Sequence, residues 1–205
     1  PVLWSKEVIK GSVVKGVVLN SGGANACTGP KGFQDTHATA EHVAKLLNHS
    51  SSEVFICSTG MIGEFLPMDK ILSGLDVLWK NLSNDSLLDC AHAIMTTDSV
   101  PKISNISKNG VQVSGIAKGA GMLAPSLATM LCVLATDAVV EPDELKAALE
   151  FATEQTFDRI DSDGCTSTND TVLVMASGSS GVKISPENLK AQLVEVCASL
   201  AHQLI

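Results

Sequence analysis

The stretch VVKGVVLNSGGANACTGPKG, residues 13–32, places a short β-branched run directly before a loop rich in glycine. Residues 13–19 are typical of a strand, and residues 34–48 carry apolar side chains at the spacing of a helix. The order of strand, loop and helix then repeats, with a strand at residues 53–58 and a helix that Pro67 opens. This alternation indicates an α/β protein.

The second half of the sequence adds an antiparallel portion to this pattern. Its residues 102–106 and 111–116 flank the pair Asn109-Gly110, which favours a tight hairpin. Further strands are predicted at residues 129–134 and 171–176, and further helices at residues 84–94 with Asn84 as the N-cap, at residues 141–155 and from Ser185 onward. The sequence therefore predicts a mixed α/β architecture, and residues 1–205 are expected to form a single domain.

The charge and the cysteines restrict the possible partners and the compartment. A formal net charge of −8 without a visible basic patch argues against binding to nucleic acid or to an anionic membrane. The six cysteines are spread evenly without a CxxC pair, which is typical of free thiols in a reducing compartment. Since no apolar stretch approaches the roughly 20 residues of a membrane span, we expect a cytoplasmic protein.

Two loops resemble binding motifs but lack the residues that those motifs require. The loop NSGGANACTG, residues 20–29, has no GK[ST] ending, and no GxGxxG opens a helix, which argues against a nucleotide site. Residues 161–170 resemble the start of a calcium loop, but Cys165 and Val172 stand where oxygen ligands are needed. The histidines are dispersed without a recognisable catalytic partner. We expect neither a metal nor a cofactor.

The stretch SLATMLCVL, residues 126–134, places Thr129 at the start of a predicted apolar strand. If the bond between Ala128 and Thr129 is cut, Thr129 gains a free α-amine beside its own hydroxyl, and one residue supplies both nucleophile and base. An α-amine with a pKa of about 7.7 to 8.0 is roughly 10 to 15% neutral at about pH 7, far more than a lysine. The same hydroxyl can make the cut where the preceding turn is bent and free of bulk, a need that the glycines of AKGAG and the following proline meet.

Acyl transfer also needs hydrogen-bond donors aimed at the carbonyl oxygen as it becomes negative. In CSTGMIG, residues 57–63, the hydroxyl of Thr59 and the N–H of Gly60 stand at the C-terminal end of a predicted strand, where a loop can present both. Lys118 lies upstream of the candidate nucleophile and can hold a substrate carboxylate by its charge. On these residues alone, acyl transfer at Thr129 is the candidate chemistry that remains.

Five stretches of the sequence resemble one enzyme family: NSGGANACTG (20–29), CSTGMIGEFLPMDK (57–70), AIMTTD (93–98), AKGAGMLAPSLATML (117–131) and DSDGCTSTNDT (161–171). They are similar to the glutamate N-acetyltransferases of arginine biosynthesis, also called ornithine acetyltransferases or the ArgJ family. The resemblance runs nearly end to end through the chain. It implies a layered α/β sandwich with mixed sheets, like that of self-processing aminopeptidases of the DmpA type and unlike a Rossmann fold.

The resemblance implies that the chain cuts itself between Ala128 and Thr129 and that Thr129 is the nucleophile. The positions that match the family's oxyanion hole are Thr59 and Gly60, and those that match its substrate contacts are Thr97, Lys118 and Thr129. The implied reaction is ping-pong: Thr129 takes the acetyl group from N-acetylornithine, ornithine leaves, and glutamate accepts the acetyl group. Some family members also accept acetyl-CoA, and the chemistry needs no cofactor or metal.

The resemblance also implies how the protein is organised. The two cleaved chains stay together as a heterodimer, which is expected to assemble to a heterotetramer. Family chains extend well beyond both ends of this one, so the sequence is expected to be the central portion of a longer chain. Further substrate-binding residues, including an acidic one, then lie after Ile205.

Two other functions stay open on the residues alone. An autoprocessing amidase or aminopeptidase with an N-terminal nucleophile uses the same threonine chemistry but passes the acyl group to water. A non-enzymatic domain that only binds a small amino acid makes Thr129 dispensable.

Overall fold

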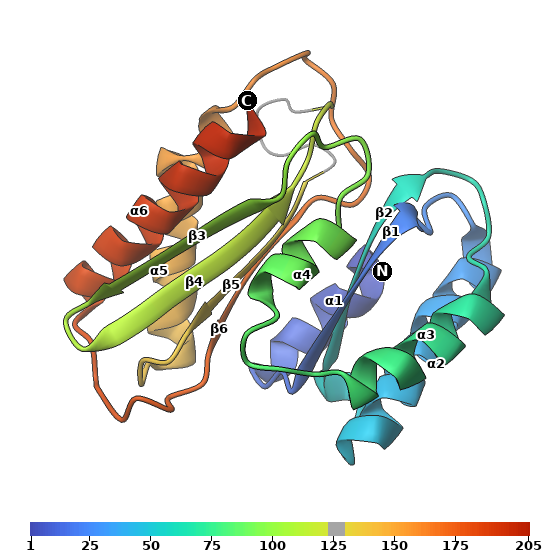
Figure 1. Ribbon diagram of the computed structural model, residues 1–205, viewed down its shortest axis with the longest axis horizontal. Coiled ribbons are helices and arrows are strands. Elements are labelled where there is room, and N and C mark those ends of the chain that lie inside the picture. The colour runs from blue at the N-terminus through green and yellow to red at the C-terminus, as the bar shows by residue number, and fades with distance from the viewer. Residues whose placement is uncertain (123–129) are drawn as a thin grey trace. The chain divides into compact units, whose positions relative to one another are not determined.

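The computed structural model describes residues 1–122 and 130–205 (Figure 1). The chain divides into two compact units, Pro1–Ser86 and Leu87–Ile205. Each unit has a sheet of its own with helices packed on it, one sheet parallel and the other mixed, so the predicted α/β class with mixed sheets is confirmed. The single domain over residues 1–205, with a cleavage junction at 128/129, stays a prediction.

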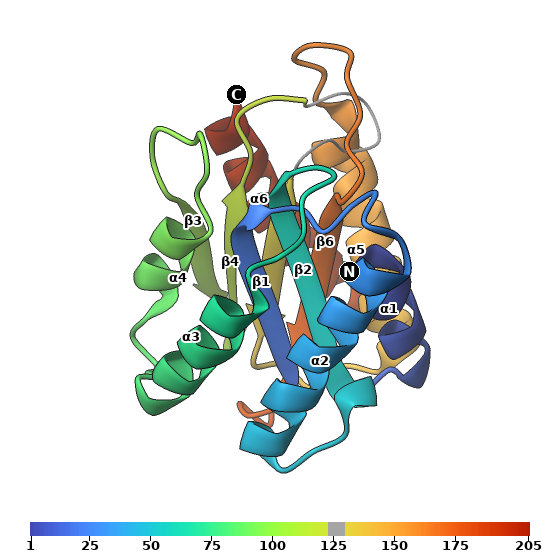
Figure 2. The same ribbon diagram turned by 90° about the vertical axis from the view of Figure 1, so that its right-hand side faces the viewer.

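The first unit is built on two parallel strands. Its elements are α1 (Val2–Val8), β1 (Gly16–Gly23), α2 (Gly29–Leu47), β2 (Val54–Met61) and α3 (Met68–Lys80), with short 3-10 turns at Ile9–Gly11 and Ser51–Glu53. β1 and β2 lie side by side, and α2 crosses them (Figure 2). The side chains of Ala40 and Ala44 on α2 pack against Val54 and Ile56 on β2. Residues 54–59 are all buried.

Both strands of the first unit extend further toward their C-terminal ends than the sequence predicts. β1 begins at Gly16 and continues to Gly23, through residues expected in the glycine-rich loop. β2 continues to Met61, so Thr59 and Gly60 lie inside the strand and not in a loop after it. The reason is pairing, because Ser21 lies opposite Thr59 and Gly22 lies opposite Gly60.

The second unit contains a four-stranded sheet of mixed direction in the order β3-β4-β5-β6. Its elements are α4 (Leu87–Ala93), β3 (Lys102–Lys108), β4 (Val111–Lys118), β5 (Leu131–Thr136), α5 (Pro142–Gln155), β6 (Thr171–Ala176) and α6 (Pro186–Leu204), with a 3-10 turn at Phe157–Arg159. β3, β4 and β5 are antiparallel neighbours, and β5 and β6 run parallel. α5 and α6 pack together on one face of the sheet (Figure 1). The core lies between them and the strands and includes Val113, Leu134, Leu193 and Val196.

Two local signals in the second unit, a hairpin turn and a helix cap, are confirmed. Asn109 and Gly110 both have positive φ, as a tight hairpin turn requires. The hydroxyl of Ser185 caps α6 by accepting a hydrogen bond from the N–H of Asn188. Asn84, however, does not cap α4, which begins only at Leu87. The Ser83 hydroxyl accepts the N–H of Asp85 instead and forms a turn before the helix.

The strand register aligns one end of each strand in this sheet, so that these ends form one border of the sheet, perpendicular to the strands. Lys102 begins β3 opposite Ala117, and Lys118 ends β4 opposite Leu131, the first residue of β5. Leu131 in turn lies opposite Thr171, the first residue of β6. We call this the Lys118 edge of the sheet, and the charged residues described below gather there.

Two further observations concern surface and thiols. In the described part of the chain, no helix combines the length and the apolar character needed to cross a bilayer. All six cysteines are free thiols, and Cys57, Cys132 and Cys197 among them are buried.

Candidate active site

Thr59 and Gly60 occupy a closely packed part of β2. Thr59 is buried, with only 2% of its surface exposed. Gly60 has φ +125°, and a Cβ at this position would lie 2.3 Å from the carbonyl carbon of Gly22 on β1. The two backbones therefore approach so closely that only glycine fits at position 60.

Polar side chains fix the ends of both strands beside this contact. The hydroxyl of Ser58 donates to Oδ1 of Asn20 at 2.6 Å, which links β2 to β1. The amide nitrogen Nδ2 of Asn20 donates to the carbonyl of Gly23 at 2.9 Å. The strand ends around Thr59 and Gly60 are thus held by side chains as well as by backbone pairing, which suits a rigid hydrogen-bond donor site.

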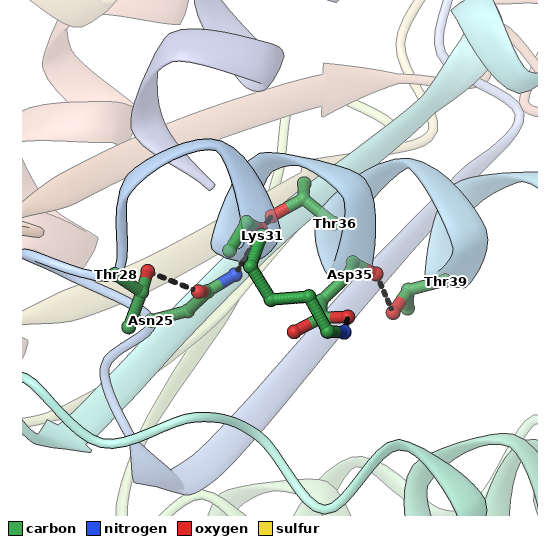
Figure 3. A network of polar contacts seen from close by, with 7 residues as sticks. Asn25, Thr28, Lys31, Asp35, Thr36 and Thr39 are labelled. Carbon is green, nitrogen blue, oxygen red and sulfur yellow. Dashed lines mark hydrogen bonds and ion pairs between the residues drawn. The ribbon is translucent and has the colours of Figure 1, made fainter.

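The loop after β1 is held to α2 by a network of side chains (Figure 3). Nδ2 of Asn25 donates to the carbonyl of Gly32 at 2.7 Å and to the hydroxyl of Thr36 at 2.9 Å, and Oδ1 accepts from the hydroxyl of Thr28. On the same helix Lys31 forms an ion pair with the buried Asp35. Oδ2 of Asp35 is buried without a protein partner among the described residues. The network fixes the glycine-rich loop, in keeping with a structural role for it.

In the second unit, Lys118 lies at the last position of β4 and is 1% exposed. Burial lowers the pKa of its ammonium group, Lys102 lowers it further, and the carboxylates of Asp98 and Asp170 oppose this change. The buried ammonium group of Lys118 is a positive charge in a region of low dielectric, where it interacts strongly with nearby charges.

Asp98 connects the turn after α4 to the Lys118 edge. Its Oδ1 accepts from Nζ of Lys102 at 2.5 Å and from the N–H of Gly119 at 2.7 Å, and its Oδ2 accepts from the N–H of Thr96 at 3.2 Å. Burial raises the pKa of Asp98, but these hydrogen bonds outweigh burial and the pKa is lowered. Asp98 thereby fixes the residue after Lys118, and it places the neighbouring Thr97, which is exposed, at the same edge.

Asp170 likewise binds a backbone N–H, directly before the start of β5. Its Oδ1 accepts from the N–H of Met130 at 2.8 Å. Burial raises the pKa of Asp170 to about 6, although the Met130 N–H, the Ser167 side chain and the charge of Lys118 act in the opposite direction.

The residues predicted from sequence belong to both units. Thr59 and Gly60 lie together in the first unit, and Thr97 and Lys118 lie near Asp98 in the second. Ala128 and Thr129 lie outside the described residues. The sequence analysis did not identify Asp98, Lys102 or Asp170 as site residues, although MTTD and TSTND contain both aspartates. In the described ranges no group of three or more His, Cys, Asp or Glu side chains could hold a metal ion.

The raised pKa of Asp170 predicts that this residue lowers the free energy of unfolding as the pH rises. The folded protein holds the neutral carboxyl up to about pH 6, so the stability that this form provides at low pH is lost as the pH rises through that value. An Asp170→Asn variant stays neutral. We expect its free energy of unfolding near about pH 8 to exceed that of the unchanged protein by about 1 to 2 kcal/mol, allowing for partial exposure.

Urea unfolding of both proteins measures this effect. Most of the difference should disappear at about pH 4, where the carboxyl is protonated in the folded state and close to half protonated in the unfolded state. Asp98 titrates in the opposite sense, but both proteins carry it and its contribution cancels. An asparagine variant that is less stable than the unchanged protein at both pH values contradicts the prediction.

The chain is similar to known proteins of one family. A model of the ArgJ family matches residues 1–205. The arginine biosynthesis bifunctional protein ArgJ of Streptomyces avermitilis is 58% identical over 205 residues, and that of Thermobifida fusca is 55% identical over the same length. Both alignments cover 100% of this chain and 54% of the relative. The chain therefore spans about half the length of the curated relatives it matches.

Solved structures show the same relationship. The crystal structure of ornithine acetyltransferase complexed with ornithine from Mycobacterium tuberculosis is 44% identical, with a TM-score of 0.53, and the match covers 62% of this chain and 69% of that one. The ArgJ protein of Bacillus halodurans is 36% identical, with a TM-score of 0.52 over 64% of this chain and 70% of that one. Because the family model spans every residue of the sequence, the chain belongs to the ArgJ family.

Proposed function

We propose that the protein acts in arginine biosynthesis by transferring the acetyl group of N-acetylornithine to glutamate. Support comes from family membership over the whole chain and from relatives of 55 to 58% identity that are named arginine biosynthesis bifunctional proteins. A 44% identical relative was crystallised with ornithine, the amine that this reaction releases. Acetyl-CoA is proposed as a second donor.

The proposed chemistry uses Thr129 twice. Its hydroxyl first attacks the carbonyl of Ala128 and displaces the nitrogen of Thr129, which leaves an ester and a free α-amine. Water then hydrolyses this ester, which breaks the chain and restores the hydroxyl. That amine then accepts the hydroxyl proton as the oxygen attacks the acetyl carbonyl of N-acetylornithine. The carbon–nitrogen bond breaks, ornithine leaves with a proton on its amine, and the acetyl group remains as an ester on Thr129. The amine of glutamate attacks this ester, restores the hydroxyl and leaves as N-acetylglutamate.

The other predicted residues serve this chemistry through charge and hydrogen bonds. We assign the hydroxyl of Thr59 and the N–H of Gly60 to the oxyanion, since each well-placed donor is worth about 10² to 10³ in rate. Lys118 and Thr97 are assigned to the substrate, with the ammonium group of Lys118 attracting a carboxylate. Both ornithine and glutamate carry an α-carboxylate, so one positive charge serves the donor and the acceptor.

The observation that carries the proposal is the Lys118 edge. A buried lysine, whose charge interacts with the carboxylates of Asp98 and Asp170, ends the strand that pairs with β5, directly opposite Leu131. Leu131 is two residues after Thr129 in the sequence. A fixed cation at this point is costly to bury and offers little to stability, but it suits the binding of an anionic amino acid.

The test is a transfer assay with the intact protein and N-acetylornithine labelled in the acetyl group. With glutamate present, we expect labelled N-acetylglutamate and free ornithine in equal amounts. Without glutamate, we expect one equivalent of ornithine and an acetyl group on the peptide that begins with Thr129, seen by mass spectrometry. Labelled acetate as the main product with glutamate present would favour the amidase or aminopeptidase alternative.

The proposal extends to assembly and compartment. We propose that the two cleaved chains form a heterodimer and that two heterodimers form a heterotetramer, which native mass spectrometry would resolve. The free thiols fit a reducing compartment, and we propose the cytoplasm.

A further inference from the structure

Met130, the residue directly before β5, is hydrogen-bonded through both its carbonyl and its N–H. The partners are Thr171, the first residue of β6, and Asp170, the residue before it. The carbonyl of Met130 accepts the N–H of Thr171 at 3.0 Å, as in an ordinary parallel ladder. The N–H of Met130 donates to a side chain, the carboxylate of Asp170, at 2.8 Å. Met130 itself is 1% exposed. The sheet therefore ends on this residue with a carboxylate where a backbone carbonyl would normally accept.

The nitrogen that Asp170 holds is the peptide nitrogen that joins Met130 to residue 129. We propose that Asp170 is a positioning residue for acyl transfer: by binding the Met130 N–H it fixes the point from which Thr129 extends. This inference rests on the proposed function, in which Thr129 is the nucleophile. Asp170 acts through Met130 and needs no contact with the substrate.

The choice of a carboxylate supports a role beyond holding the strand. An ionised acceptor makes a shorter and stronger hydrogen bond to an N–H than a neutral one. Its cost is the burial of a negative charge, which Lys118 offsets only in part, as the raised pKa of Asp170 shows. Asparagine could accept the same hydrogen bond without that cost. A residue that lowers stability at neutral pH is typical of a functional site.

The same sheet contains a matched control at its opposite end. Oδ1 of Asp137 accepts the N–H of Gln112 at 2.7 Å, next to the pair of Val113 and Thr136. This bond also joins a carboxylate to a backbone amide near a strand end, here between the end of β5 and the start of β4. It lies at the end of the strands away from Lys118, so its loss should weaken the sheet without affecting the site.

The experiment compares Asp170→Ala, Asp170→Asn and Asp137→Ala in the intact protein. We expect the alanine variant at 170 to lose about 10²-fold in kcat for acetyl transfer, because small misplacements of a reacting group cost this much, with little change in KM. The asparagine variant keeps an acceptor for the Met130 N–H and should recover at least about tenfold of that loss. Asp137→Ala should keep kcat within about twofold of the unchanged protein.

Three outcomes overturn the inference. One is a normal kcat in the alanine variant at 170, and another is an equal loss in Asp137→Ala, which would show a general effect on the sheet. The third is an asparagine variant as slow as the alanine variant, since charge and not the hydrogen bond would then matter. If the alanine variant does not fold, the asparagine variant decides alone, and a loss above about 10²-fold in it overturns the inference.

These results are distinct from a failure of the proposed function. An unchanged protein that transfers no acetyl group overturns both, because there is then no reaction for Asp170 to assist. An active unchanged protein with any of the three outcomes above overturns the role of Asp170 alone.

Discussion

Replacing Thr129 with alanine is expected to abolish both self-cleavage and acetyl transfer. In the proposed mechanism the hydroxyl of this residue makes the cut, and its α-amine exists only after the cut. Loss of a nucleophile that works together with its base costs at least about 10⁴-fold in kcat. A denaturing gel should show one uncut chain, and the transfer assay should show no N-acetylglutamate above background.

A serine at the same position is the matched control. Thr129→Ser keeps a hydroxyl beside the α-amine, so cleavage and transfer should both persist at a reduced rate. Mass spectrometry should then find the acetyl group on the new N-terminal serine. Full transfer activity in the alanine variant, or an acetyl group on any other residue of the unchanged protein, refutes the nucleophile assignment.

The second large effect is expected from Gly60→Ala. The new methyl group would lie 2.3 Å from the carbonyl carbon of Gly22 and 2.5 Å from its oxygen, and φ at this position is +125°. Overlap with backbone atoms cannot be relieved by a side-chain rotation, so β1 and β2 must separate. Strain from φ and overlap together should lower the free energy of unfolding by about 4 kcal/mol.

Gly74 on α3 provides the comparison. A Cβ at Gly74 meets no atom within 4 Å, and the residue lies inside a regular helix. Gly74→Ala should therefore raise the free energy of unfolding by about 0.5 to 1 kcal/mol. Thermal and urea unfolding, read by circular dichroism, measure both variants. Equal stabilities for the two would show that β1 and β2 do not approach each other as closely as described.

The comparison of sequence and structure shows which signals are local. Pro67, Ser185 and the pair Asn109-Gly110 marked their helices and hairpin correctly, because caps and turns depend on neighbouring residues. The length of β2 was missed, because Thr59 and Gly60 extend the strand only through pairing with β1.

The site residues also differ in how far the sequence alone predicts them. Lys118 could be named from sequence as a charge upstream of Thr129, and its burial between carboxylates could not. Asp98 and Asp170 are 72 positions apart in the numbering of the sequence, and each binds the amide of a residue far from it along the chain. Their roles depend on the register that brings the ends of four strands to one edge. No spacing within a motif encodes that register.

The position of β5 also determines what the proposed cleavage before Thr129 would do to the protein. β5 lies between β4 and β6, and it is hydrogen-bonded to both. The break leaves β3 and β4 on one product and β5 and β6 on the other, so a single sheet is then shared by two polypeptides. To separate the two polypeptides, the hydrogen bonds between β4 and β5 must break and the hydrophobic core must open. The proposed cleavage would therefore leave two polypeptides held together by one sheet and one core, and separating them would require unfolding of this unit.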